Sequence, residues 1–233
     1  MIKIRKSNDR GETKINWLHG KHSFSFGGYQ DVNHMGFGHL RVINEDIVKP
    51  GMGFAPHSHQ NMEIITYILD GKLEHKDSLG NGSIIVPGDV QRMSAGTGIT
   101  HSEFNPQKDH LVHLLQIWII PNQQDITPSY EQKNFSHKRK NNQLTLLVSQ
   151  DGRNDSLRIH QDASMSVLDL DANQSFSHTI EKDRLLWVQM ASGQAVINQH
   201  MVNQGDGIAI RDEKDLIFKA DQKSEILIFD LAA

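Results

Sequence analysis

The sequence predicts an all-β protein made of two stacked β-barrels, and three observations carry that prediction. Short β-branched and apolar runs follow one another closely between Gly, Pro, Asn and Asp, which is typical of a sandwich or barrel. Helical periodicity is nearly absent. A weak internal repeat relates residues 67–90 to residues 188–208, because each copy contains a strand, a glycine turn, a second strand and a Gly-Asp pair. We therefore expect two barrels of related design.

The expected strands follow in order along both halves of the chain. They lie at 41–48, 62–69, 83–88 and 111–120, and then at 144–148, 166–170, 185–190, 194–198, 207–210, 216–220 and 225–231. We place Gly71 and Gly193 in tight hairpin turns, and the Gly-Asp pairs at the start of the next strands. The polar segment 121–143 holds two of the six prolines and indicates a connection. The resulting prediction is an N-terminal domain at 1–125, a linker at 126–143 and a C-terminal domain at 144–233.

Composition narrows the class of function. A chain of 233 residues with 37% hydrophobic residues is ordinary for a soluble globular protein. The N-terminus has no apolar signal region, and the longest apolar segment, 111–120, is interrupted by His113 and Gln116, so we expect no membrane insertion and no secretion. A formal net charge of -4 argues against nucleic-acid binding. The absence of cysteine suits the cytoplasm and restricts any metal site to His, carboxylate or water ligands.

Two pairs of potential metal ligands stand out. His57 and His59 are spaced i, i+2, and His101 and Glu103 repeat that spacing after a glycine-rich turn. Residues i and i+2 of a strand point to the same face, so each pair can project into one barrel interior. One His-x-His pair is expected by chance from 14 histidines, whereas two pairs in phase are not. Three imidazoles and one carboxylate suit a borderline divalent transition metal, with positions left for water or substrate.

The other histidines are expected to be structural or are left unassigned. His110 and His113 lie in a strand-like run and face opposite sides, and His75 is expected to form a hydrogen bond across its sheet. The unassigned histidines of the N-terminal region are His19, His22, His34 and His39. In the second barrel, His160, His178 and His200 are isolated, so we expect no metal there and a structural or partner-facing role.

The motifs around these ligands resemble those of the cupins and, more closely, of the pirin family. Gly51-(x5)-His57-x-His59-(x3)-Glu63-(x7)-Gly71 resembles the first cupin motif, and Gly98-x-x-His101-x-x-x-Asn105 resembles the end of the second. Gly96 stands where that second motif often has proline. The segments HSFSFGGYQDVNHMGFGHLRVINED, PHSHQNMEIITYILDG, MSAGTGITHSEFNP, YEQKNF and RIHQDASM are similar to bacterial pirins, and they span nearly the whole chain.

The resemblance implies a bicupin with iron in the N-terminal barrel, held by His57, His59, His101 and Glu103. Manganese, cobalt, nickel, copper or zinc would also suit these ligands. Glu63 occupies the glutamate position of the general cupin motif, but the resemblance to pirins implies that it lies outside the metal's ligands. Phe54, Met62 and Phe104 are expected either to line a pocket or to pack in the core.

The implied activity is that of a quercetin 2,3-dioxygenase, which opens the flavonol ring with O₂ and releases carbon monoxide. Glu103 is then the candidate proton acceptor for the flavonol hydroxyl. The main alternative is a metal-dependent binding module that contacts a regulatory protein, as in the nuclear pirins. A weaker alternative is a non-oxidative cupin such as a sugar isomerase.

Overall fold

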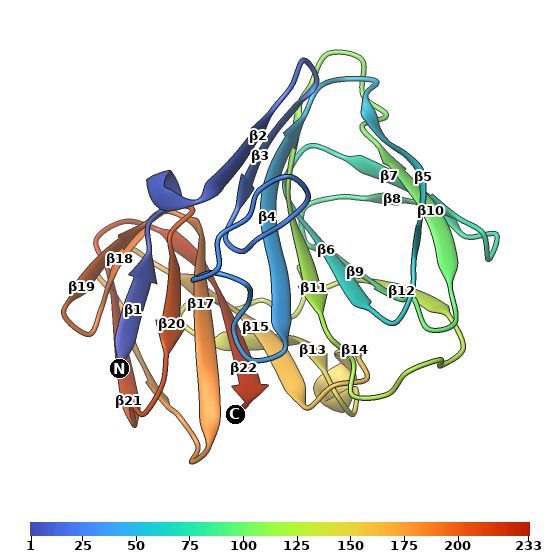
Figure 1. The fold of residues 1–233 in the computed structure, drawn as a ribbon. Helices are drawn as coiled ribbons and strands as arrows, with labels where there is room; N and C mark the ends of the chain where they lie inside the picture. The colour runs from blue at the N-terminus through green and yellow to red at the C-terminus, as the bar shows by residue number, and fades with distance from the viewer. The chain divides into compact units, whose positions relative to one another are not determined.

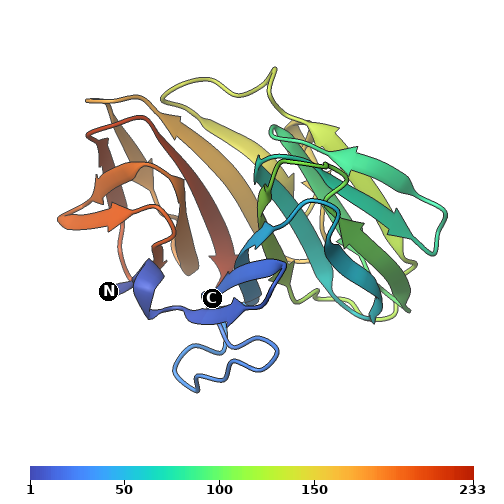
Figure 2. The same ribbon diagram turned by 90° about the horizontal axis from the view of Figure 1, so that it is seen from above.

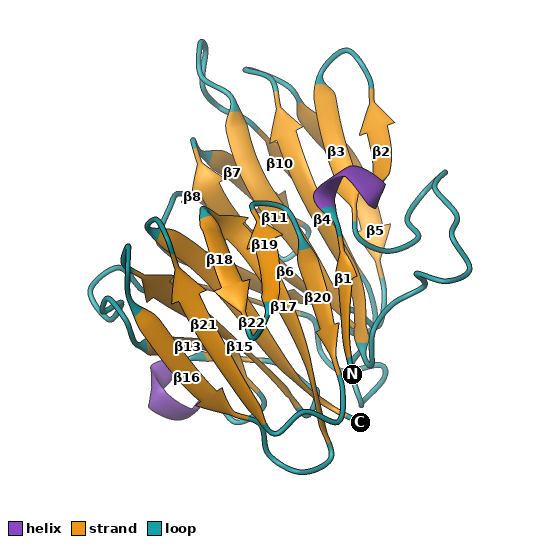
Figure 3. Cartoon of the chain, turned by 90° about the vertical axis from the view of Figure 1, so that its left-hand side faces the viewer, coloured by secondary structure: helices purple, strands orange, loops and turns teal.

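The computed structural model describes all 233 residues, and the chain is almost entirely β-structure (Figure 3). The helical segments are two 3-10 turns, η1 at Ser7–Asp9 and η2 at Arg153–Asp155. The all-β prediction is therefore confirmed. The structure contains no helix that is long and apolar enough to cross a membrane.

Contacts divide the chain into two compact units, which are described separately. The N-terminal unit comprises Gly11–Ser136 and Ile159–Gln161. The C-terminal unit comprises Met1–Arg10, His137–Arg158 and Asp162–Ala233. Each unit is built from one seven-stranded and one four-stranded sheet. This shared construction agrees with the internal repeat.

The two sheets of the N-terminal unit form the walls of one barrel (Figures 1 and 2). Leu18, Val48, Ile68 and Val112 of the larger sheet pack with Leu73 and Ile85 of the smaller one in a common core. The larger sheet has the order β12 (Ser129–Asn134), β9 (Asp89–Ser94), β6 (Glu63–Asp70), β11 (Val112–Ile119), β4 (Leu40–Val48), β3 (Leu18–His22) and β2 (Gly11–Lys14). The smaller sheet has the order β5 (Gly53–His59), β10 (Ile99–Phe104), β7 (Leu73–Asp77) and β8 (Gly82–Ile85).

The C-terminal unit repeats this plan around an apolar core of 16 buried residues. Its larger sheet has the order β1 (Ile2–Arg5), β20 (Gly207–Ile210), β17 (Arg184–Ser192), β22 (Ser224–Ala232), β15 (Ala163–Leu170), β13 (Leu144–Ser149) and β14 (Leu157–Arg158). Its smaller sheet has the order β16 (Ser175–Thr179), β21 (Asp215–Ala220), β18 (Gln194–Ile197) and β19 (His200–Asn203).

At each of the two repeated glycines the chain crosses from one sheet to the other and does not form a hairpin. Gly71 and Gly193 both have φ of +81°, which confirms that each takes a conformation favouring glycine. However, β6 and β7 on either side of Gly71 belong to different sheets, and so do β17 and β18 on either side of Gly193. The hairpin prediction was therefore wrong. A strand–glycine–strand pattern does not reveal whether the second strand pairs with the first or crosses to the opposite wall.

The bounds of the two units differ from the ranges 1–125 and 144–233. Strand β1 pairs residue by residue with β20, so the first residues of the chain complete the C-terminal unit. The expected linker, 126–143, contains β12, which pairs with β9 at the edge of the larger N-terminal sheet. Its polar sequence resembles a loop because an edge strand with few buried side chains needs no apolar alternation. Whether either unit folds as an independent domain stays a prediction.

Gly53 allows strand β5 to approach strand β10 closely. A Cβ at this position would lie 2.1 Å from the carbonyl oxygen of Glu103 and 2.5 Å from Cα of Phe104. We expect Gly53→Ala to lower the free energy of unfolding by about 1–3 kcal/mol, because the two strands must separate. Gly82→Ala, at an exposed position of β8, is the matched control, since the nearest atom would be 3.9 Å away. Equal denaturation midpoints for the two variants would contradict the prediction.

Candidate functional site

The two predicted ligand pairs lie on adjacent antiparallel strands. His57 of β5 is directly opposite His101 of β10, and their Nε2 atoms are 3.1 Å apart. The ring centroids of His57, His59 and His101 are separated by 4.5, 4.8 and 4.9 Å. The ligand atoms of these three side chains all lie within 4.8 Å of one another. The i, i+2 pattern therefore did predict which imidazoles meet.

The local backbone of β5 explains how these side chains converge. β5 is an edge strand, so Pro56 can occupy it without a backbone N–H to donate to the sheet. Next to this proline the register shifts: His101 pairs with His57, whereas Glu103 pairs with Phe54. The shift lies on the β5 side, so His101 and Glu103 keep their i, i+2 spacing and both remain buried. The carboxyl group therefore faces the same interior as the imidazoles.

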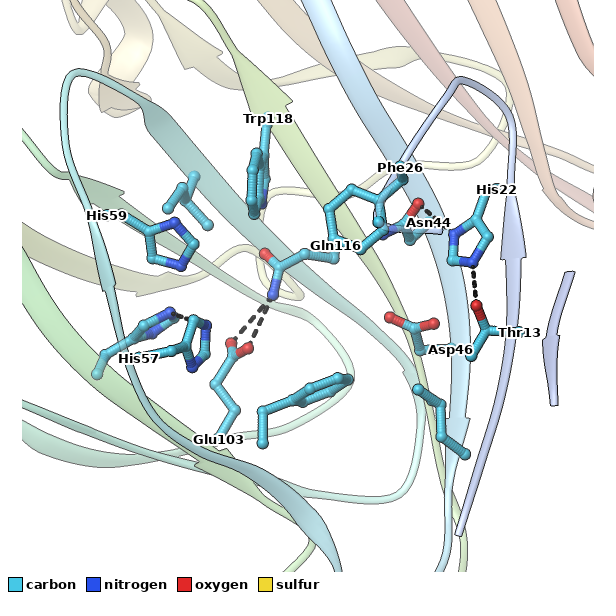
Figure 4. A pocket seen from close by; sticks show the side chains of 15 residues that line it. Thr13, His22, Phe26, Asn44, Asp46, His57, His59, Glu103, Gln116 and Trp118 are labelled. Atoms are coloured by element: carbon cyan, nitrogen blue, oxygen red, sulfur yellow. Dashed lines mark hydrogen bonds between the residues drawn. The ribbon is translucent and has the colours of Figure 1, made fainter. Parts of the chain in front are cut away.

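Glu103 is a buried carboxyl group held by polar neighbours. Gln116 Nε2 donates to both carboxyl oxygens, at 3.2 and 2.9 Å (Figure 4). Thr66 Oγ1 donates to Oε1 at 3.3 Å. Burial raises the pKa of Glu103, because desolvation disfavours the charged form more than its neighbours stabilise it. A raised pKa makes this carboxylate a better proton acceptor than an exposed glutamate.

Two of the three clustered histidines, His59 and His101, are neutral imidazoles at neutral pH. Burial lowers the pKa of His59 to about 4, and burial followed by the charges of His57 and His59 lowers the pKa of His101 to about 3. His57 Nδ1 donates to the carbonyl oxygen of Ala55 at 2.8 Å, which leaves its Nε2 facing His101. Neutral imidazole nitrogens and a carboxylate are the donors that a borderline divalent metal accepts. The set can therefore hold such an ion.

Glu63 has different partners from the cluster. Ser94 Oγ donates to Glu63 Oε2 at 2.7 Å, while the backbone N and Nδ1 of His160 donate to Oε1 at 3.1 and 2.9 Å. Its carboxyl group is thus already hydrogen-bonded on both oxygens, and it does not line the cavity described below. The prediction assigned His160 to the second barrel, but this residue packs within the N-terminal unit.

The remaining histidines mostly meet carboxylates. His110 and His113 bond to Asp70 and Glu45 at 2.8 and 2.9 Å, contacts that agree with the expected structural roles. His75 was expected to bond across the sheet; its Nε2 instead lies 3.1 Å from Asp77 Oδ2, two residues along the same strand.

His75 also lies next to the cluster. Glu103 is its cross-strand neighbour, and its ring centroid is 5.3 Å from that of His101. Its ligand atoms form a second possible group with those of His101 and Glu103, but it does not line the cavity.

A cavity of about 150 Å³ opens beside the cluster inside the N-terminal barrel (Figure 4). Its apolar walls include two edge-to-face aromatic contacts, with Trp118 at 5.4 Å from Phe26 and 4.9 Å from His59. Phe54 lines the cavity, which is one of its two expected roles. Met62 packs against the core, and Phe104 does not line the cavity. The full lining is Thr13, Leu18, His22, Phe26, Gly27, Asn44, Asp46, Phe54, His57, His59, Ile64, His101, Glu103, Gln116 and Trp118.

A row of buried polar residues crosses the larger sheet and was missed at the sequence level. Gln116 of β11 pairs with Thr66 of β6 on one side and with Asn44 of β4 on the other, and Asn44 pairs with His22 of β3. The available signal was Asn44-x-Asp46 within the strand expected at 41–48, which repeats the i, i+2 spacing of the ligand pairs. In the sequence, Gln116 stands out only as an interruption of an apolar run.

The lowered histidine pKa values predict a pH dependence in the metal-free protein. Both histidines titrate near 6.5 when unfolded, so below that pH the unfolded chain binds more protons than the folded one. Stability should therefore fall as the pH drops from about 6.5 towards 4, and the histidines should contribute nothing above 6.5. The raised pKa of Glu103 makes stability change with pH in the opposite direction. The informative comparison is therefore with His101→Gln, which removes one of the two histidines and retains Glu103. Chemical denaturation of that variant should show a shallower decline; an unchanged slope would contradict the lowered pKa.

Comparisons with known proteins cover both units. The sequence model of the family described as Pirin matches residues 3–119, and the model described as the quercetinase C-terminal cupin domain matches residues 146–231. The quercetin 2,3-dioxygenase of Escherichia coli K12 is 45% identical over 231 residues, which cover 99% of each chain. A putative quercetin 2,3-dioxygenase of Pasteurella multocida is 44% identical and covers 99% of this chain and 100% of its own.

A solved structure agrees with these relatives. The crystal structure of the bacterial pirin YhhW from Escherichia coli in complex with nickel(II) has a TM-score of 0.95 to this chain at 44% identity. It covers 100% of this chain and 99% of its own. The expectation of two cupin domains in one chain is confirmed by these matches.

Proposed function

Because the chain belongs to the pirin family, we propose that it is a metal-dependent quercetin 2,3-dioxygenase that opens the flavonol ring with O₂ and releases carbon monoxide. The observation that carries this proposal is the cavity, where three imidazoles and a buried carboxyl group meet apolar aromatic walls. Relatives of that name match the chain over its full length. We place the enzyme in the cytoplasm, in keeping with the lack of cysteine.

We assign the metal to His57, His59, His101 and Glu103. The ligand nitrogens of the three imidazoles lie within 4.8 Å of one another, and the carboxyl group of Glu103 lies within that distance of His101. Burial lowers the pKa of His59 and of His101, and all four residues line the cavity. A divalent transition metal follows from this donor set and from the nickel(II) complex of the related pirin. We favour Fe(II) as the native ion; the same donors would accept manganese, cobalt, nickel, copper or zinc.

The protein's own part in the reaction centres on Glu103. A metal bound there supplies a Lewis acid that acidifies the flavonol 3-hydroxyl and a redox-active centre for O₂. Glu103 accepts the hydroxyl proton at a carboxyl oxygen. Gln116 and Thr66 orient the carboxyl group through their hydrogen bonds.

The cavity walls position a flat aromatic substrate. Phe26, Phe54 and Trp118 present ring faces and edges to the space beside Glu103. Aromatic surfaces bind planar rings by burial and stacking, and they exclude water from the site of proton transfer. Substrate binding at this place therefore sets the 3-hydroxyl against the proton acceptor.

The metal assignment predicts about one transition-metal ion per chain. His57→Ala and His101→Ala should each lose most of that metal, because each removes one of the four donors. His110→Ala is the matched control, since this exposed imidazole bonds only to Asp70 on the surface. Elemental analysis of the purified variants checks the prediction. Full metal retention in both ligand variants, or two ions per chain, would contradict a single site in this barrel.

The proton-acceptor role predicts that Glu103→Gln lowers quercetin cleavage by about 100-fold or more, even after reloading with metal. Glutamine keeps the shape of the side chain and one carbonyl oxygen but removes the charge and the basicity. Oxygen consumption with quercetin measures the effect.

The matched control for this variant is Glu63→Gln. It alters a buried glutamate outside the cavity and should affect stability more than turnover. A larger loss of turnover in Glu63→Gln than in Glu103→Gln would instead place the functional glutamate at the position of the general cupin motif. The absence of any flavonol turnover in metal-replete wild type would favour the regulatory binding module instead.

A further inference from the structure

The end of the cavity away from the histidine cluster carries a second group of buried polar side chains. Figure 4 shows Thr13, His22 and Asp46 on one side of Gln116 and His57 with His59 on the other. We propose that Asp46, supported by His22, Asn44 and Thr13, forms a subsite that binds phenolic hydroxyl groups on a ring of the polyphenol substrate. The inference rests on the proposed function for the identity of that substrate and adds the residues that select it.

A hydrogen-bonded chain fixes this wall. His22 Nδ1 donates to Asn44 Oδ1 at 2.8 Å, so a neutral His22 accepts at Nε2, where Thr13 Oγ1 donates at 2.8 Å. His22 and Asn44 are each only 3% exposed, and the register places them directly opposite each other on β3 and β4. A buried chain of this kind holds its members in one orientation. The wall is therefore rigid before a ligand arrives.

The fold makes specific room for the carboxyl group of Asp46. Asp46 is 5% exposed and lies two residues after Asn44 on β4, with Gly20 of β3 directly opposite it. A Cβ on Gly20 would lie 2.5 Å from Asp46 Oδ1, so the carboxyl group occupies the space of the missing side chain. Gly20 in turn pairs with Thr13 of β2. The glycine thus lets the carboxyl group lie across β3, at the cavity wall.

The chemistry of this end suits phenols. A carboxylate offers about four acceptor positions and no donor, and a phenolic hydroxyl is a strong donor on a flat apolar ring. The neighbouring walls, Leu18, Phe26 and Phe54, are apolar and suit the ring itself. Trp118 Nε1 on the same cavity is buried without a hydrogen-bond partner and can donate to a ligand oxygen. A phenolic hydroxyl can donate to an acceptor position of the Asp46 carboxylate, and a ligand oxygen can accept from Trp118 Nε1, whereas a hydrocarbon ring makes neither hydrogen bond.

Asp46→Asn is the test variant, because it keeps the shape and removes the charge. The probes are flavonols that differ only in ring hydroxyls: quercetin, galangin without hydroxyls on the pendant ring, fisetin without the 5-hydroxyl, and 3-hydroxyflavone without either set. Dissociation constants are measured without O₂ by fluorescence quenching of the protein as purified. Turnover is measured separately as kcat and KM.

We expect Asp46→Asn to weaken quercetin binding by about 10-fold or more, the scale of a hydrogen bond to a charged group, and 3-hydroxyflavone binding by less than about 2-fold. The loss should be in KM rather than in kcat. If galangin escapes the loss, Asp46 binds the hydroxyls of the pendant ring; if fisetin escapes it, Asp46 binds the 5-hydroxyl. If neither escapes it, Asp46 binds the 7-hydroxyl, which both flavonols keep and 3-hydroxyflavone lacks. Gly20→Ala should produce the same selective loss by displacing the carboxyl group while keeping its charge. Asp70→Asn, an exposed surface change, is the control.

The outcomes separate this inference from the proposed function. Equal losses for quercetin and 3-hydroxyflavone in Asp46→Asn, or no loss for either, overturn the phenol subsite even if wild type cleaves flavonols. Selective binding without any flavonol turnover supports the subsite and overturns the dioxygenase proposal. Preserved melting temperatures show that the losses do not come from misfolding.

Discussion

The antiparallel pairing of β5 with β10 is the constraint on which the site depends. It places His57 opposite His101, and Gly53 permits a distance between the strands that no larger residue would allow. Pro56 is compatible with this pairing only because β5 lies at the edge of its sheet, where a missing N–H leaves no bond unmade. If the two strands separated, the donors would no longer converge, and the buried carboxyl group of Glu103 would lose the environment that raises its pKa.

Several polar side chains in the interior of this barrel hold one another by hydrogen bonds, as Gln116 and Thr66 hold Glu103 and as His22 holds Asn44. Gln116 Nε2 donates to the carboxyl group of Glu103, and Gln116 pairs with Asn44 on the neighbouring strand, so Glu103 and the polar row of the larger sheet belong to one framework. Unpaired polar groups in such a place would cost about 1–3 kcal/mol each. The same framework leaves an apolar cavity between two polar ends. A planar, hydroxylated ring system matches that distribution of surface.

The C-terminal unit shows that the architecture alone does not produce the site. By sheet order, β16 and β21 correspond to β5 and β10. Where β10 carries His101 and Glu103, β21 carries Leu216 and Phe218, which are fully buried in an apolar core. The same strand positions therefore support either a polar cavity or a packed interior, depending on the side chains that point inward.

The amino-acid pattern alone predicted the β-class, the repeated plan and the candidate ligand residues, because alternation along a strand is a local property that spacing reveals. His57-x-His59 and His101-x-Glu103 were identifiable for that reason. Which strands are neighbours became visible from the folded chain. The pairing of β1 with β20, the polar edge strand β12 and the position of Asp46 opposite Gly20 depend on contacts between distant residues. Register across a sheet comes from packing of whole strands, and no single segment contains that information.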